Sequence, residues 1–153
     1  MRYSMFFSRK LKAFALFLFI LVPNLGNALT PPLSPDELLE DSDLVIEGQV
    51  VGEVVCLSQT VPNKCFNRMD YQTEVKVLKV LKGKAKKKKN IPVHFFHNDF
   101  AKGKCVGDQG AALYQGDIGT FYLKKSDQDY YYPFHWSSVN IQTQGSKTWP
   151  SCK

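Results

Sequence analysis

Six lysines within eight residues form the most concentrated chemical feature of this sequence. They stand between two segments with strand-like alternation and comprise Lys82, Lys84, Lys86, Lys87, Lys88 and Lys89. A cationic loop of this kind can attract an anionic glycan, lipid headgroups, lipopolysaccharide or nucleic acid. The alternative is a solvated loop whose charge prevents aggregation. We treat it as a candidate anionic-ligand loop, with an acidic envelope polymer or a membrane surface as the expected partner rather than nucleic acid.

Three histidines, His94, His97 and His135, invite a metal hypothesis. On a strand, however, positions three apart point to opposite faces, so His94 and His97 are poorly placed to share an ion. No nucleophile motif, HExxH helix or phosphate-binding glycine loop accompanies them. The sequence therefore predicts no catalytic residue, no metal site, no cofactor and no enzymatic activity.

Aromatic residues crowd the segment from Tyr130 to Trp136. Alternation places Tyr130, Tyr132 and Phe134 on one side and Tyr131 on the other, and one of the two sets is expected to fill the core. The remaining hypothesis is an exposed face for carbohydrate or peptide that is formed by Tyr131, His135 and their neighbours.

Four cysteines, Cys56, Cys65, Cys105 and Cys152, predict two structural disulfides. Three pairings are possible. Cys56 and Cys65 flank a polar segment that resembles a loop, so a bridge between them is the preferred arrangement, which leaves Cys105 to pair with Cys152. Neither spacing matches a zinc site or a redox-active CxxC pair.

Residues 1–28 have the pattern of a secretory signal peptide. Four basic residues precede an apolar run from Ala13 to Val22, which is too short for a membrane span, and Gly26-Asn27-Ala28 supplies the small residues of a cleavage site. The alternative is an uncleaved anchor. Cleavage after Ala28 would leave no transmembrane anchor and reduce the net charge from +6 to about +2. The chain is therefore expected to be exported, to the periplasm or the extracellular space.

Residues 29–153 are the length of one domain. Ser34, Pro35 and Glu37 predict a short capped helix. After it, Leu44, Ile46, Val50 and Val54 alternate, with Gly48 and Gly52 on the same face. A strand from Tyr71 slips phase at Leu78, which indicates a β-bulge. Further strands are expected at 91–95, 119–123 and 130–136. The prediction is an all-β fold, a small antiparallel barrel of five to six strands.

Three segments together are similar to the netrin-module and tissue-inhibitor-of-metalloproteinases superfamily. They are the run Ser42–Val50, the strand from Tyr71 to Gly83, and Gly119–Leu123. The resemblance covers roughly residues 36 to 125 and implies an OB-like barrel. It also implies inhibition of a zinc protease through an N-terminal cysteine, but the expected mature start, Leu29-Thr30, has no cysteine.

Two functions follow as the main hypotheses, and an enzyme that uses His94, His97 or His135 is a third alternative. The first is an exported, non-catalytic binding module for an unknown protein partner, with an inhibitor-like OB fold. The second is a structural protein of the cell envelope that holds an anionic polymer or a membrane surface through its lysine-rich loop. A single protein partner would favour the first, whereas salt-sensitive binding to many polyanions would favour the second.

Overall fold

The computed structural model describes residues 30–62, 64–100 and 107–152. The predicted signal peptide, its cleavage site and Cys105 lie outside these described residues. Within them the chain forms one short helix followed by seven strands. No helix in these ranges has the length and apolar character needed to cross a membrane.

The helix α2 spans Pro35–Asp41 and begins as the sequence predicts. The Ser34 hydroxyl accepts a hydrogen bond from the Glu37 backbone N–H (3.3 Å), and the Ser34 N–H donates to the Glu37 carboxylate (2.8 Å). Bonds from the Ser34 hydroxyl and then from its backbone lower the pKa of Glu37, because they favour the charged carboxylate. Leu38 is buried and Leu39 is exposed, so only one leucine of α2 joins the core.

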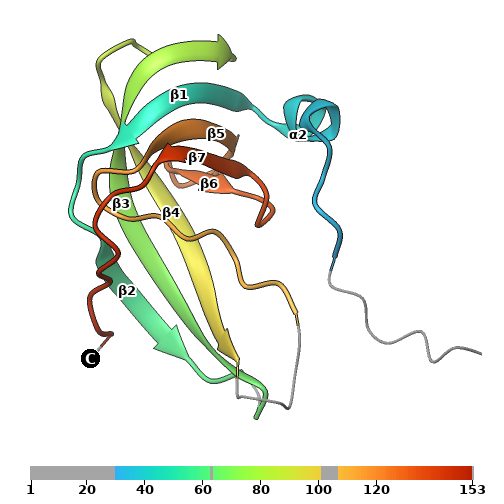
Figure 1. Cartoon of the computed structure of the whole chain (residues 1–153), viewed down its shortest axis with the longest axis vertical. Helices are drawn as coiled ribbons and strands as arrows, with labels where there is room; N and C mark the ends of the chain where they lie inside the picture. Colours follow the sequence, from blue (N-terminus) through green and yellow to red (C-terminus); the bar gives the residue numbers. More distant parts are fainter. Residues whose placement is uncertain (1–29, 63, 101–106, 153) are drawn as a thin grey trace, which may run out of the picture.

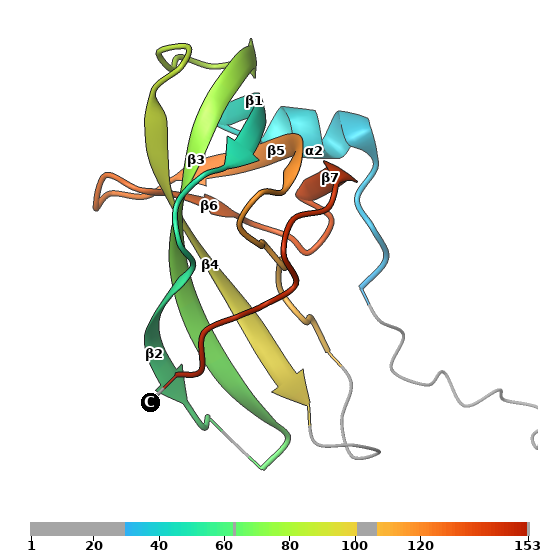
Figure 2. The same cartoon turned by 60° about the vertical axis from the view of Figure 1, so that its left-hand side comes forward.

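Backbone pairing joins five strands into a closed ring (Figures 1 and 2), in the order β1, β3, β4, β6, β5 and back to β1. The seven strands are β1 Leu44–Val50, β2 Val55–Thr60, β3 Phe66–Lys82, β4 Asn90–Phe100, β5 Ile118–Lys125, β6 Tyr131–Pro133 and β7 Val139–Thr143. All pairings are antiparallel except β4–β6, where Val93 lies beside Tyr131 in a parallel arrangement. The predicted β-rich class is confirmed. The sequence predicts five to six strands, and the described residues form seven, of which five make the ring. The prediction that all pairings are antiparallel is wrong, because β6 runs parallel to β4.

Two strands lie outside the ring. β2 pairs with the first half of β3, whose second half pairs with β1, and β7 pairs with the first half of β5. The segment after Cys56 is therefore a strand and not the loop that the sequence predicts, and β7 is a strand that the sequence pattern does not indicate. Nearly every side chain of β2 is exposed, so the strand lacks the apolar alternation that would reveal it. Its conformation comes from backbone bonding to the long β3.

The core lies inside the ring and follows the predicted alternation of β1. Leu44, Ile46 and Val50 are all buried against residues of β3, β4 and β5. Gly48 is on the same face, where an added Cβ would meet the Val75 side chain at 2.7 Å. Glycine at this position therefore allows β1 and β3 to approach closely.

Two β-bulges bend the second half of β3. Between β1 and β3 the register jumps from Lys82 to Val80 and again from Lys79 to Val77, so Leu81 and Leu78 are the extra residues. The bulge that the sequence indicates at Leu78 is confirmed. Extra residues on one strand increase its bend and twist, which helps the strands curve into a ring.

The disulfide pattern differs from the prediction. Cys56 on β2 is bonded to Cys152, with the two Cα atoms 5.4 Å apart. Both preferred pairs, Cys56 with Cys65 and Cys105 with Cys152, are therefore wrong. The C-terminal segment runs back along the molecule and ends beside β2 (Figure 2), which brings together two residues 96 positions apart. Cys65 is disulfide-bonded as well.

Candidate binding groove

A groove of about 450 Å³ lies over β3 and β4 on the side away from the core. The middle of β2 forms one end of it, and the segment around β6 forms the other. Its lining combines aromatic rings with a few hydrogen-bonding side chains, namely Leu57, Ser58, Arg68, Asp70, Tyr71, His94, Phe95, Phe96, Tyr130, Tyr132, Pro133 and Phe134.

Strand alternation explains which side chains reach the groove. On β4, Val93 and Phe95 are buried in the core, so His94 and Phe96 point to the opposite face. The β3–β4 register places Asp70 directly beside Phe96, next to the buried pair of Tyr71 and Phe95. The groove is thus built on a sheet whose other face is packed, which holds its floor in place.

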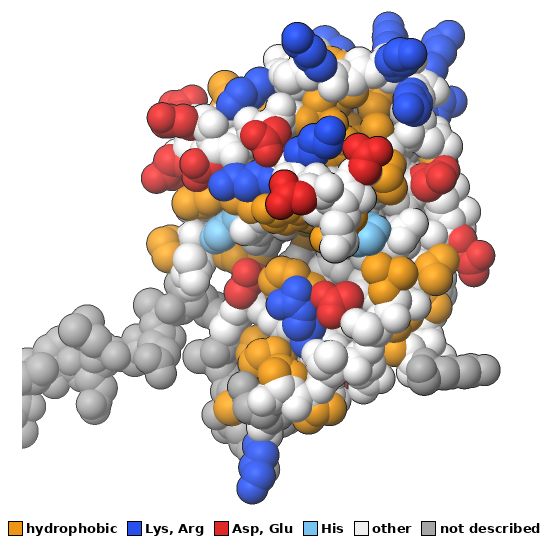
Figure 3. Space-filling model, turned by 180° about the vertical axis from the view of Figure 1, so that it is seen from behind, with side chains coloured by type: hydrophobic (Ala, Val, Ile, Leu, Met, Phe, Trp, Pro, Cys, Tyr) orange, Lys and Arg blue, Asp and Glu red, His pale blue; other side chains and the backbone are white. Residues whose placement is uncertain are grey.

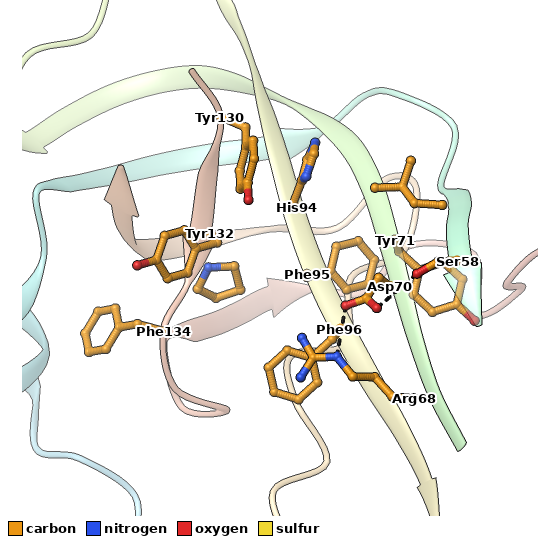
Figure 4. A pocket seen from close by; sticks show the side chains of 12 residues that line it. Ser58, Arg68, Asp70, Tyr71, His94, Phe95, Phe96, Tyr130, Tyr132 and Phe134 are labelled. Carbon is orange, nitrogen blue, oxygen red and sulfur yellow. Dashed lines mark hydrogen bonds and ion pairs between the residues drawn. The ribbon is translucent and has the colours of Figure 1, made fainter. Parts of the chain in front are cut away.

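An ion pair lies along β3 on one side of the groove (Figure 4). Arg68 Nε lies 3.0 Å from Asp70 Oδ1, and the Ser58 hydroxyl donates to Asp70 Oδ2 at 3.2 Å. The Arg68 guanidinium also lies over the Phe96 ring, 4.2 Å from its centroid. Asp70 uses one of the five N–H donors of Arg68, so the pair still presents donors and acceptors to the groove.

His94 and Tyr130 form a stacked pair at the other end. Their ring centroids are 3.7 Å apart and the rings are within 10° of parallel. Burial lowers the pKa of His94, so its imidazole is uncharged near neutral pH. Figure 4 shows the His94 and Tyr130 rings face to face above the ion pair. Tyr132 and Phe134 lie on the left of that view, across the groove from the ion pair. Lys124 covers Phe134, with its Nζ 4.8 Å from the ring centroid.

The structure places the aromatic run differently from the candidate face of Tyr131 and His135. Tyr131 packs against the core, whereas Tyr130, Tyr132 and Phe134 line the groove. His135 does not line it, and its Nδ1 is hydrogen-bonded with the Ser137 hydroxyl at 2.7 Å. The alternation pattern separated the two sides of this segment correctly, and the parallel pairing with β4 decides which of them reaches the groove.

The three histidines do not converge. His94 faces the groove, while His97 lies on the core side of β4, edge-on to Trp149 at 4.5 Å. His97 is in β4 and not in a loop. Within the described ranges, no group of three His, Cys, Asp or Glu side chains is placed to hold a metal ion.

Opposite the groove, the core side of β3 and β4 is closed by the C-terminal segment. Trp149 contacts the rings of Tyr71, His97 and Tyr114, and its indole N–H donates to the Leu113 carbonyl at 3.0 Å. Upstream, the Gly145 N–H donates to the buried carboxylate of Asp117 at 2.6 Å. The Cys56–Cys152 disulfide anchors the end of this segment.

The lysine-rich loop connects β3 to β4 and divides into two parts. Lys82 donates to the carbonyls of Leu39 and Glu40, at 2.6 and 3.0 Å, so it caps the end of α2. The others are exposed, and none takes part in the ion pairs of the described chain: Lys84, Lys86, Lys87, Lys88 and Lys89. Figure 3 shows basic side chains gathered at this end of the molecule, away from the groove.

Fold and site together define a β-rich protein with an aromatic, hydrogen-bonding groove on the outside of a ring of strands. No protein-family model, no curated protein and no solved structure matches the chain. The groove's own chemistry therefore carries the functional argument.

Proposed function

We propose that this chain is an exported, non-catalytic binding protein that takes its ligand in the groove over β3 and β4. The observation that carries the proposal is the combination of rings and hydrogen-bonding side chains on a packed sheet. A concave site of about 450 Å³ falls within the usual size range of ligand pockets, roughly 300 to 1,000 Å³. Rings supply contact area, and a few polar groups supply orientation.

Binding fits the groove better than catalysis does. The carboxylate of Asp70 is engaged by Arg68 and Ser58, and the imidazole of His94 is stacked on Tyr130. A general acid or base must have an atom within hydrogen-bond reach of the substrate proton that it moves. In the groove, Asp70 is engaged by an ion pair and His94 by a ring stack, so neither is set aside for proton transfer.

An exported location is part of the proposal. A disulfide such as Cys56–Cys152 persists in oxidising compartments, which include the periplasm and the extracellular space. This agrees with the interpretation of residues 1–28 as a signal peptide.

We also propose that the fold is an OB-like barrel of the kind found in the netrin and metalloproteinase-inhibitor superfamily. The ring of five strands with a single parallel pairing supports it. Protease inhibition through an N-terminal cysteine is not part of this proposal, because the expected mature start lacks that residue.

A second candidate function is retention of an anionic polymer or membrane surface by the lysine-rich loop. The observation that favours it is the set of exposed, unpaired lysines at one end of the described molecule, from Lys84 to Lys89. Such a surface would bind many polyanions, and added salt would weaken the binding.

Capture from envelope and secreted fractions separates the two functions. Three forms are compared: the parent, a groove variant, Tyr132→Ala, and a loop variant in which Lys86 to Lys89 are serine. If the parent and the loop variant capture a discrete ligand and the groove variant does not, the result supports ligand binding in the groove. If only polyanions are captured, and both the loop variant and added salt abolish the capture, the lysine-rich loop is the functional surface and the groove proposal is wrong.

A further inference from the structure

We infer that the ligand of the groove is a neutral carbohydrate. The inference rests on the proposed binding function of the groove and names its ligand class. It depends on three properties of the lining, which are its charge balance, the backbone of its floor and the arrangement of its rings.

Charge balance argues against an anionic ligand. Among the described residues that line the groove, Arg68 is the one cation and Asp70 the one carboxylate, and they neutralise each other across 3.0 Å. The Lys124 ammonium lies over Phe134, outside this lining. His94 is uncharged near neutral pH, because burial lowers its pKa. The exposed lysines of the β3–β4 loop do not line the groove. A phosphate or carboxylate ligand that approached Arg68 would lie next to the Asp70 carboxylate, which would repel it.

The floor of the groove argues against an extended peptide. Peptides that bind sheets usually add a strand to a free edge, where main-chain bonds supply the affinity. Here β3 and β4 are paired with each other continuously, from Phe66 with Phe100 to Lys76 with Asn90. The facing edges of β3 and β4 are therefore closed to an added strand, and the side chains that rise from these strands supply the contacts of the groove floor.

A sugar ring matches the arrangement of these side chains. One face of a pyranose is made of C–H groups, and its rim carries hydroxyls that both donate and accept hydrogen bonds. In the groove, Tyr132 offers a ring on which no other ring or cation of the described chain is stacked. On the opposite side of the groove (Figure 4), Arg68 has N–H donors beyond the one that bonds Asp70, and the Asp70 carboxylate has lone pairs beyond those that Arg68 and Ser58 occupy in the described chain.

Each of the other rings is already in contact with a neighbouring side chain. Arg68 covers Phe96, His94 covers Tyr130, and Lys124 covers Phe134. Side chains that are already ordered lose little conformational entropy when a ligand arrives. Such preorganisation matters for sugars, whose hydroxyls must give up hydrogen bonds to water before they bind.

The test uses protein produced from the full coding sequence and recovered with its disulfides formed. It is applied to an array of neutral linear oligosaccharides of hexose, N-acetylhexosamine and pentose units, with heparin and an extended-peptide array in parallel. Any binder is then titrated by calorimetry. We expect an oligosaccharide to bind, and Tyr132→Ala to weaken it about tenfold. Tyr132→Phe, which keeps the ring, should retain most of the affinity.

A matched control is Trp136→Ala, which removes an exposed ring outside the groove and should leave saccharide affinity unchanged. If peptides bind in a Tyr132-dependent way and saccharides do not, the carbohydrate inference is overturned and the groove function survives. Saccharide binding that is indifferent to Tyr132→Ala would also overturn it. If only heparin binds, through the lysines, both the inference and the groove proposal fail.

Discussion

His94 and His97 are three residues apart on β4 and lie in contrasting surroundings. His94 stacks on Tyr130 in an open groove, and His97 meets the edge of Trp149 beneath the C-terminal segment. Burial lowers the pKa of both imidazoles. One strand therefore supports a ligand-facing surface on one side and a closed, structural surface on the other.

The two faces are held by different kinds of contact. On the core side, Trp149 and the Cys56–Cys152 disulfide connect residues far apart in the sequence, so their loss should reduce the stability of the whole molecule. In the groove, the contacts are half-buried stacks and an ion pair whose net energies are small. Substitutions there should alter binding more than stability.

The largest effect is expected from the disulfide. Replacing Cys56 and Cys152 together by serine should lower the free energy of unfolding by about 2 to 5 kcal/mol, because the bond restrains a long loop in the unfolded chain. Urea denaturation followed by fluorescence measures this. Thr60→Ala, an exposed site on β2, is the control and should change stability by less than about 0.5 kcal/mol. A double-serine variant as stable as the parent would contradict the structural role of the bond.

Trp149 and Tyr132 test the contrast directly. Trp149→Ala should cost about 3 kcal/mol, because it removes a large ring that packs against Tyr71 and Tyr114. Tyr132→Ala should cost about 1 kcal/mol or less, because its ring faces the groove. Equal losses in denaturation experiments would show that the two faces do not differ as described.

A smaller difference in stability is expected between Lys82, which caps α2, and the exposed Lys87 of the same loop. Lys82→Met should lower the free energy of unfolding by about 1 kcal/mol, since two carbonyls at the end of α2 lose their donor. Lys87→Met should change it by less than about 0.5 kcal/mol. Thermal denaturation of the two variants side by side measures the difference, and the reverse order would exclude the capping role of Lys82.

The smallest effect is a dependence of stability on pH. In the unfolded chain each imidazole binds a proton near its ordinary pKa of 6.5, whereas burial makes folded His94 and His97 resist protonation. Between the folded pKa and 6.5 the unfolded state carries more protons, so stability is full above pH 6.5 and falls as the pH drops below it. Urea denaturation at pH 7.5 and 5.5 measures this. His94→Gln and His97→Gln should each flatten the dependence, and a stability that rises on acidification would refute the sign.

Features governed by neighbouring residues were predictable. The capping box of Ser34 and Glu37, the buried face of β1 and the bulge at Leu78 follow from backbone geometry over a few residues. The same alternation correctly separated His94 from His97. These predictions do not depend on which strands pair with each other.

The groove and the disulfide could not be obtained in this way. Arg68, His94 and Tyr132 come from three segments, and only the parallel pairing of β6 with β4 brings them to one surface. Likewise, nothing local to Cys56 indicates that a segment 96 residues later returns to it.

The local sequence pattern therefore determines the short helix and the strands that have a buried face. It also determines the side of a strand on which each residue lies, and the charge of the lysine-rich loop. The tertiary structure alone decides that β2 is a strand, that Lys82 caps α2 rather than joining the other lysines, and that Tyr132 faces a groove. The reason is physical: alternation and capping depend on bonds between near neighbours, whereas pairing partners are selected by the free energy of closing the whole ring.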